Sequence, residues 1–294
     1  MSSSLIGVRD HVTTNDNVEL VVESFGSTAP SATVVLLIHG WSGSRRSFKA
    51  NAAAIAALSP NVRVVTYDQR FHGDSAKPEW GHHVARLAAD LHAVLTTLNL
   101  ADVTAVGTSL GCAVLWSYVE LFGQERLGQL VFVDQAPLQN RVPDWELGSK
   151  GCYDTVSYAG LVRALNAGMK QFANGNVLAC ATLPLSADLL AVLEEDTLKC
   201  SADDLAALMY DHTAQDWRRI LPRITIPVLN VAGAQSAIFP PEGVHVVGDL
   251  CVDGVNVTFE RSNHWLYMEE PEKFNAMLLK FATDGERPSN GARL

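Results

Sequence analysis

Gly107-Thr108-Ser109-Leu110-Gly111 is the stretch that decides the fold of this chain. It follows a strand-like run at 102–106 and leads directly into a helix-like run. The pattern G-x-S-x-G between a strand and a helix is typical of a nucleophile elbow, a tight turn that lifts a serine hydroxyl out of the backbone. The two flanking glycines have a steric reason to lack side chains, because the turn leaves no room for them. The stretch therefore predicts Ser109 as a reachable nucleophile at the carboxyl end of a sheet.

Short apolar runs alternate with helical patterns on both sides of this turn. Residues 33–38 form a continuous apolar run, which is typical of a strand buried on both faces. Further strands are predicted at 18–25, 62–67, 102–106, 129–133, 228–232 and 255–259, and helices at 47–58, 83–98, 112–122 and 271–281. Such alternation predicts an α/β fold, with a mostly parallel, doubly wound sheet covered by helices on both faces.

The alternation stops between residues 136 and 222. Three helices are predicted there instead, at 155–173, 186–199 and 201–217. An all-helical insertion after the sixth strand predicts a lid, and we expect most of its aromatic side chains to fill its own core. The predicted domains are an α/β core, residues 1–137 and 222–294, and a helical lid, residues 138–221.

Composition limits the classes of partner. The chain has 294 residues, 48% hydrophobic and 18% charged, with a formal net charge of −10. These values are ordinary for a globular enzyme, and the acidic balance argues against nucleic acid as a partner. No apolar run is long enough to span a bilayer. The expected partner is a small-molecule substrate. The sequence leaves the oligomeric state open.

Cysteine usage and the chain ends bear on location. Five cysteines are widely spread without a C-x-x-C pair, which favours a reducing compartment and buried free thiols, with no metal and no cofactor. No signal peptide is visible at the start. The end, Ala292-Arg293-Leu294, resembles a peroxisomal address of the Ser-Lys-Leu type. We expect an intracellular protein, cytoplasmic or, in a eukaryotic source, peroxisomal.

Several motifs in the expected order resemble the α/β-hydrolase superfamily over nearly the whole chain. His39-Gly40-Trp41 follows the buried strand at 33–38. The run Asp68-Gln69-Arg70-Phe71-His72-Gly73-Asp74-Ser75 resembles the family's D-x-R-G-x-G-x-S turn, with Phe71 in place of its first Gly. The elbow comes next, and Asn263-His264-Trp265 resembles the loop that carries the family's catalytic histidine. The resemblance implies a serine-nucleophile member of this superfamily.

The resemblance also assigns a catalytic triad. A serine hydroxyl needs a base within hydrogen-bond reach, and His264, in the loop after the last strand, is the best candidate. The family usually carries its acid in a G-x-x-D turn, but here that turn ends in Ser236. Asp134, directly after the strand at 129–133, is the proposed acid, and Glu242 is the alternative.

The oxyanion hole needs two backbone N–H groups aimed at the developing negative charge. Leu110, after the nucleophile, is expected to supply one and Trp41 the other, in a loop that His39 is expected to shape. Trp41, Phe239 and Trp145 are the predicted substrate-binding side chains.

The favoured function is a serine hydrolase that cleaves a small, fairly apolar ester, thioester or lactone through an acyl-enzyme. Relatives that dehalogenate haloalkanes or open epoxides use Asp as nucleophile, so the serine argues against both. The alternative is a cofactor-independent ring-cleaving dioxygenase or a lyase that uses the His–Asp pair as a base. A ligand-sensing receptor on the same fold is the third reading.

Overall fold

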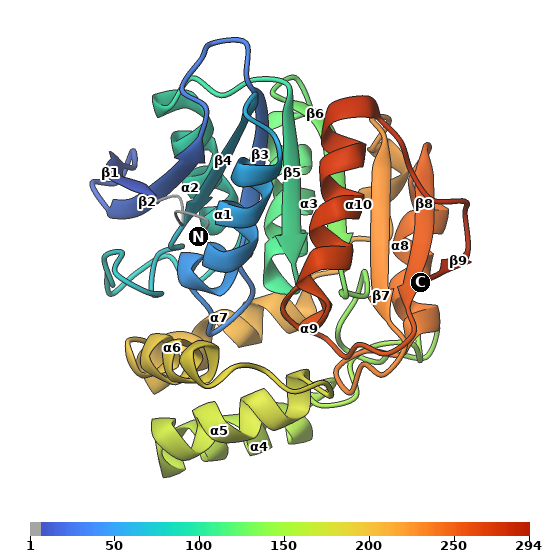
Figure 1. Ribbon diagram of the computed structural model, residues 1–294. Coiled ribbons are helices and arrows are strands. Elements are labelled where there is room, and N and C mark those ends of the chain that lie inside the picture. The colour runs from blue at the N-terminus through green and yellow to red at the C-terminus, as the bar shows by residue number, and fades with distance from the viewer. Residues whose placement is uncertain (1–6) are drawn as a thin grey trace.

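The computed structural model describes residues 7–294, and in this part of the chain a sheet of nine strands forms the centre of the molecule (Figure 1). Its order is β1-β2-β4-β3-β5-β6-β7-β8-β9. The strands are β1 Val8–Thr13, β2 Glu19–Gly26, β3 Thr33–Ile38, β4 Val62–Tyr67, β5 Val103–Thr108, β6 Leu127–Val133, β7 Val228–Gly233, β8 Gly254–Phe259 and β9 Ala292–Arg293. Strand β2 is antiparallel to β1 and β4, and the other neighbours are parallel. The predicted mostly parallel sheet is confirmed.

Helices cover both faces of this sheet. On one face lie α1 (Lys49–Leu58) and α10 (Pro271–Asp284), and on the other lie α2 (Val84–Thr97), α3 (Leu110–Phe122) and α8 (Pro241–Leu250) (Figure 1). Each layer has its own apolar core, because the central strands bury side chains on both sides. The doubly wound arrangement is therefore confirmed, and α8, β1 and β9 are additions that the sequence pattern did not predict.

The segment between β6 and β7 is helical, but it differs from the prediction. It holds four helices in place of three: α4 (Thr155–Ala167), α5 (Met169–Cys180), α6 (Ala187–Leu198) and α7 (Ala202–Ala214). The prediction of one continuous helix at 155–173 is wrong. Gly168 separates α4 from α5, because its φ of 151° and ψ of 120° form a conformation that favours glycine.

Helices α4 to α7 lie below the carboxyl ends of the parallel strands (Figure 1). Polar contacts join α6 and the residue after it to the loops of the core. Arg46 Nη1 lies 3.0 Å from the Asp196 carboxylate, and Lys199 Nζ lies 2.8 Å from Asp74. Ser44 Oγ donates to the buried Asp196 as well. The helical segment is thus held over the edge of the sheet where the elbow lies.

The elbow has no space for side chains beside Ser109. A Cβ on Gly107 would lie 2.4 Å from the Gly111 carbonyl oxygen, and a Cβ on Gly111 would lie 2.5 Å from the Ile38 oxygen. Both contacts are with backbone, which cannot rotate away. The predicted steric reason for these glycines is confirmed.

We expect Gly107→Ala to lower the free energy of unfolding by roughly 1–3 kcal/mol, the usual range for overpacking. Urea unfolding followed by circular dichroism measures it. Gly175→Ala is the matched control, because a Cβ there meets nothing within 4 Å. Since alanine favours the helix α5, the control is expected to be neutral or stabilising. Equal stability of the two variants would contradict the steric argument.

All five cysteines are free and buried, as the sequence predicts: Cys112, Cys152, Cys180, Cys200 and Cys251. Burial raises the pKa of Cys152 to about 11 and the pKa values of Cys200 and Cys251 to about 12. They therefore pack as small apolar groups.

The carboxyl-terminal tripeptide is hydrogen-bonded to β8. The Leu294 N–H donates to the Thr258 oxygen, and the Glu260 N–H donates to the Leu294 oxygen. Nothing in the structure supports peroxisomal targeting, which stays a prediction. Across residues 7–294, every helix is too short or too polar to cross a membrane.

Candidate active site

Ser109 lies in the turn between β5 and α3, with φ 51° and ψ −120°. A positive φ is uncommon outside glycine and holds the side chain clear of both elements. The Ser109 backbone N–H donates to the Val133 carbonyl oxygen at 3.0 Å, and the Cys112 N–H donates to the backbone carbonyl oxygen of Ser109 at 2.8 Å. A Cβ on Gly40 would lie 3.2 Å from the Ser109 Cβ, so the loop after β3 lies against the turn.

His264 and Asp134 are in direct contact although they lie far apart in the chain. The Asp134 Oδ2 atom is 2.6 Å from His264 Nδ1. Asp134 is fully buried and His264 is 6% exposed. Asp134 follows β6 and Ser109 follows its parallel neighbour β5. The side chains of Ser109 and Asp134 therefore lie at the same carboxyl edge of the sheet. A buried carboxylate on Nδ1 favours the tautomer that carries its proton on Nδ1, which leaves Nε2 free to act as a base.

The departure at Ser236 has a structural explanation. Its Oγ donates to Asp134 Oδ2 at 2.7 Å, and the Gly233 N–H donates to Oδ1 at 3.0 Å. The turn that usually carries the family's acid therefore supplies hydrogen bonds to the carboxylate on β6. The alternative acid, Glu242, is an exposed residue in the first turn of α8.

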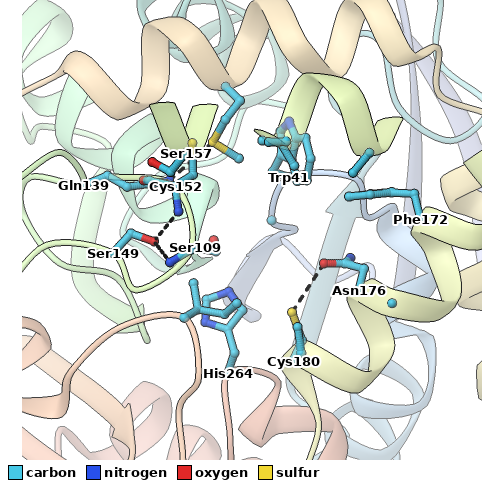
Figure 2. Close-up of a pocket in the computed structure, with 18 of the residues that line it drawn as sticks. Trp41, Ser109, Gln139, Ser149, Cys152, Ser157, Phe172, Asn176, Cys180 and His264 are labelled. Carbon is cyan, nitrogen blue, oxygen red and sulfur yellow. Dashed lines mark hydrogen bonds between the residues drawn. The ribbon is translucent and has the colours of Figure 1, made fainter. Parts of the chain in front are cut away.

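Ser109 and His264 line one cavity of about 620 Å³ (Figure 2). No hydrogen bond joins the Ser109 hydroxyl to His264 among the described contacts. Catalytic hydrogen bonds are often long or misaligned without substrate and tighten when it binds. The arrangement thus has the parts of a Ser–His–Asp triad, and the catalytic roles stay predictions.

The two predicted oxyanion donors are the backbone N–H groups of Trp41 and Leu110. Among the hydrogen bonds of residues 7–294, none is donated by the backbone N–H of Trp41 or of Leu110. The Trp41 indole N–H donates to the Leu205 oxygen at 2.9 Å, and its ring packs edge-on against Phe172, with the centroids 5.6 Å apart. The Trp41 side chain is thereby fixed as a cavity wall, while its amide remains available to a ligand.

Phe239 and Trp41 line the cavity, as predicted, but Trp145 does not. Trp145 packs in an apolar cluster with Phe239, and its indole N–H donates to the Leu138 oxygen at 2.9 Å. Its ring therefore packs behind the wall that Phe239 forms, and substrate binding by Trp145 stays a prediction without support from the cavity lining. Phe172 packs against the lid's own apolar cluster and also lines the cavity.

The loops next to the site contain two buried neutral histidines. His39 Nε2 accepts from the Gln69 N–H at 3.0 Å, and His72 Nε2 accepts from the Ser42 N–H at 3.3 Å. Desolvation lowers the pKa of His39 to about 4 and that of His72 to about 3. His39 therefore braces the loop that carries Trp41.

Phe71 shows why the family prefers glycine at its position. Its φ is 71°, in the left-handed region, and it is fully buried. The ring stacks on His82, with the centroids 4.1 Å apart. This packing is what compensates the backbone strain in a chain that has Phe there.

We expect stability to fall as the pH drops from about 6.5 to 4. His39, His72 and His212 are buried, and desolvation lowers each pKa from 6.5 to about 4, 3 and 4 respectively. In this window the unfolded chain binds more protons than the folded one, so each histidine removes up to about 1.4 kcal/mol per pH unit. Urea unfolding at pH 7.5, 6 and 5 measures the effect. Constant stability between pH 7.5 and 5 would contradict it.

Residues 7–294 contain no group of three or more His, Cys, Asp or Glu side chains placed to hold a metal ion.

Most of the chain matches one protein family. The α/β hydrolase fold family matches residues 33–271. The chain belongs to the α/β hydrolase family. The match covers the strand β3, the elbow, the helical segment and the His264 loop, which are the regions that form the site described above.

This α/β hydrolase is similar to proteins named as a lactonase, an esterase and a bromoperoxidase. It is 28% identical to 3-oxoadipate enol-lactonase 2 of Acinetobacter baylyi, over 75% of this chain and 79% of the relative. An esterase from Exiguobacterium antarcticum superposes with a TM-score of 0.87 at 20% identity, over 94% of this chain and 100% of the esterase. A bromoperoxidase from Bacillus anthracis superposes with a TM-score of 0.86 at 23% identity, over 94% of this chain and 100% of the bromoperoxidase. The two structural matches show the shared fold alone.

Proposed function

We propose that this α/β hydrolase is a serine hydrolase that cleaves a small, uncharged ester, thioester or lactone through an acyl-enzyme. The contact between His264 Nδ1 and Asp134 Oδ2, at 2.6 Å beside the elbow serine, is the observation that carries the proposal. The family match and the esterase and lactonase names among its relatives support the same reaction class.

In the proposed mechanism, His264 Nε2 takes the proton of Ser109 as the hydroxyl attacks the carbonyl carbon. The amides of Trp41 and Leu110 hold the oxyanion. The imidazolium of His264 gives the proton to the leaving group, and Asp134 stabilises that charged form. Water, activated by His264 in turn, releases the acid and restores Ser109.

The character of the cavity supports an uncharged substrate. No Asp, Glu, Lys or Arg is among the residues that line it. Its walls are mainly apolar, and they include Trp41, Leu161, Phe172, Met209, Ile238 and Phe239. Burying an unpaired carboxylate or ammonium there would cost several kcal/mol, so charged substrates are expected to react poorly.

A pH-stat assay with two matched esters tests this function. We expect ethyl butanoate to be hydrolysed with kcat/KM at least a hundredfold above that of monoethyl succinate, whose second carboxylate would be buried unpaired. Equal rates for the pair would contradict the assignment of an uncharged substrate. No hydrolysis of either ester, nor of matched lactones or thioesters, would contradict the hydrolase assignment.

The second candidate is a cofactor-independent dioxygenase or lyase, which would use the same His264–Asp134 pair as a base. The apolar cavity beside that pair is the observation in its favour. Oxygen uptake with hydroxyquinolones, in the absence of ester hydrolysis, would favour this candidate. A ligand-sensing receptor would instead show very slow turnover and a ligand-dependent rise in Tm.

The helices α4 to α7 are part of the proposal as a lid. We assign residues 138–221 to this lid and residues 7–137 and 222–294 to the α/β core; residues 1–6 of the predicted core lie outside the described residues. The lid supplies Phe172 and His212 to the cavity, whereas the core supplies Ser109 and His264.

A further inference from the structure

Gln139, Ser149 and His212 are buried polar residues that line the cavity and are not used by the proposed mechanism. They are 5%, 1% and 3% exposed, so each is almost completely removed from bulk water. None of them was singled out by the sequence patterns. Buried polar groups are normally hydrogen-bonded, and unused bonding capacity in such a place needs an explanation.

The three residues belong to one corner of the cavity. The Ser149 backbone N–H donates to the backbone carbonyl oxygen of Gln139 at 2.8 Å, and the Gln139 Nε2 atom donates to Met209 Sδ at 3.4 Å. Met209 and His212 are one turn apart on α7, so their side chains point to the same side. Figure 2 shows Gln139 and Ser149 on the same side of the cavity as Ser109, opposite Phe172 and Asn176.

Each of these residues has hydrogen-bonding capacity left over. The Gln139 Nε2 atom donates to the backbone carbonyl oxygen of Cys152 and to Met209 Sδ. The Gln139 Oε1 atom accepts no hydrogen bond from the described residues. Ser149 Oγ accepts from the N–H groups of Gly151 and Cys152, and its own hydrogen has no acceptor within residues 7–294.

His212 has no hydrogen-bond partner in the described chain, and its Nδ1 atom is enclosed by protein. A buried N–H without an acceptor is rare and costly. The proton is therefore better placed on Nε2, the ring nitrogen that is not enclosed. Desolvation lowers the pKa of His212 to about 4, so the ring is neutral near pH 7. His212 then offers one N–H donor to the cavity and carries no charge.

We propose that Gln139, Ser149 and His212 form a second recognition site that binds a hydroxyl group of the substrate, remote from the bond that is cleaved. A hydroxyl donates to Gln139 Oε1 and accepts from His212 Nε2–H, and Ser149 adds a rotatable donor. Few other uncharged groups of that size satisfy both a donor and an acceptor. The inference deepens the proposed function, on which it rests, and narrows the substrate class to hydroxylated esters or lactones.

Paired esters that differ only by a hydroxyl test this site. Ethyl butanoate is compared with ethyl 2-hydroxybutanoate and ethyl 3-hydroxybutanoate, and phenyl acetate with its 3-hydroxy and 4-hydroxy derivatives. Each kcat/KM is divided by the rate of hydroxide-catalysed hydrolysis, which removes differences in intrinsic reactivity. We expect at least one hydroxylated ester to exceed its parent by tenfold or more, because a site built for a hydroxyl discriminates against its absence.

Variants of the corner then link the preference to its residues. We expect His212→Leu and Gln139→Leu each to reduce the preference for the hydroxylated ester to within about twofold. Asn176→Leu is the matched control on the opposite wall. Its amide already bonds to Ser42 Oγ at 3.2 Å and Cys180 Sγ at 3.5 Å. The control is expected to keep the preference.

A binding measurement separates this inference from the hydrolase proposal. In the Ser109→Ala variant, the hydroxylated ester is expected to raise Tm more than its parent, and adding His212→Leu is expected to abolish the difference. This readout holds even if the chain hydrolyses no ester. The second site is refuted if no hydroxylated compound is preferred in either assay, or if the preference survives both His212→Leu and Gln139→Leu.

Discussion

Asp134→Asn is expected to lower kcat by about 10⁴-fold, with KM changed only a few-fold. The carboxylate contacts His264 Nδ1 at 2.6 Å, and Asp134 itself is fully buried. An asparagine of the same shape offers no charge to the imidazolium and permits the wrong tautomer. The rates of wild type and variant on the preferred ester, with Tm as a check on folding, measure the loss.

A second substitution distinguishes a lost charge from general damage. Ser236 already hydrogen-bonds to the acid at 2.7 Å, in the turn where the family usually carries its carboxylate. We expect the double variant Asp134→Asn/Ser236→Asp to recover at least tenfold in kcat over Asp134→Asn, because it returns a carboxylate to the neighbourhood of His264. If Asp134→Asn keeps more than a tenth of the wild-type kcat, the assignment of the acid is wrong.

Ser109→Ala is expected to lower kcat by about 10⁵- to 10⁶-fold, since it removes the atom that forms the acyl-enzyme. His264→Ala should be similarly inactive. The double variant should be no worse than either single variant, because residues that act as a unit are strongly non-additive. Additive losses in the double variant would show that Ser109 and His264 act independently.

Much of the fold, and the position of Ser109, Asp134 and His264 at one edge of the sheet, could be predicted because the strand order brings these segments together. Strands β5 and β6 are parallel neighbours, so the residues that follow them, Ser109 and Asp134, must lie at the same edge. The loop after β8 returns His264 to that edge. The flanking glycines are dictated by backbone contacts that any such turn would make.

The cavity wall could not be predicted in the same way. Whether an aromatic side chain points into the cavity or behind its wall depends on packing between distant segments, as the opposite outcomes for Trp145 and Phe172 illustrate. The break at Gly168 resembles a tolerated glycine within a helix until its φ of 151° is known. His212 lies in a helix whose pattern gives no sign that Nδ1 lacks a partner.

Covalent trapping of the nucleophile tests the central claim most directly. The protein is treated with a neutral fluorophosphonate, digested, and analysed by mass spectrometry. We predict one phosphonate adduct, on Ser109, formed together with complete loss of ester hydrolysis, and none on Ser109→Ala. An unmodified Ser109 in fully inactivated protein, or an adduct confined to another residue, would contradict the account.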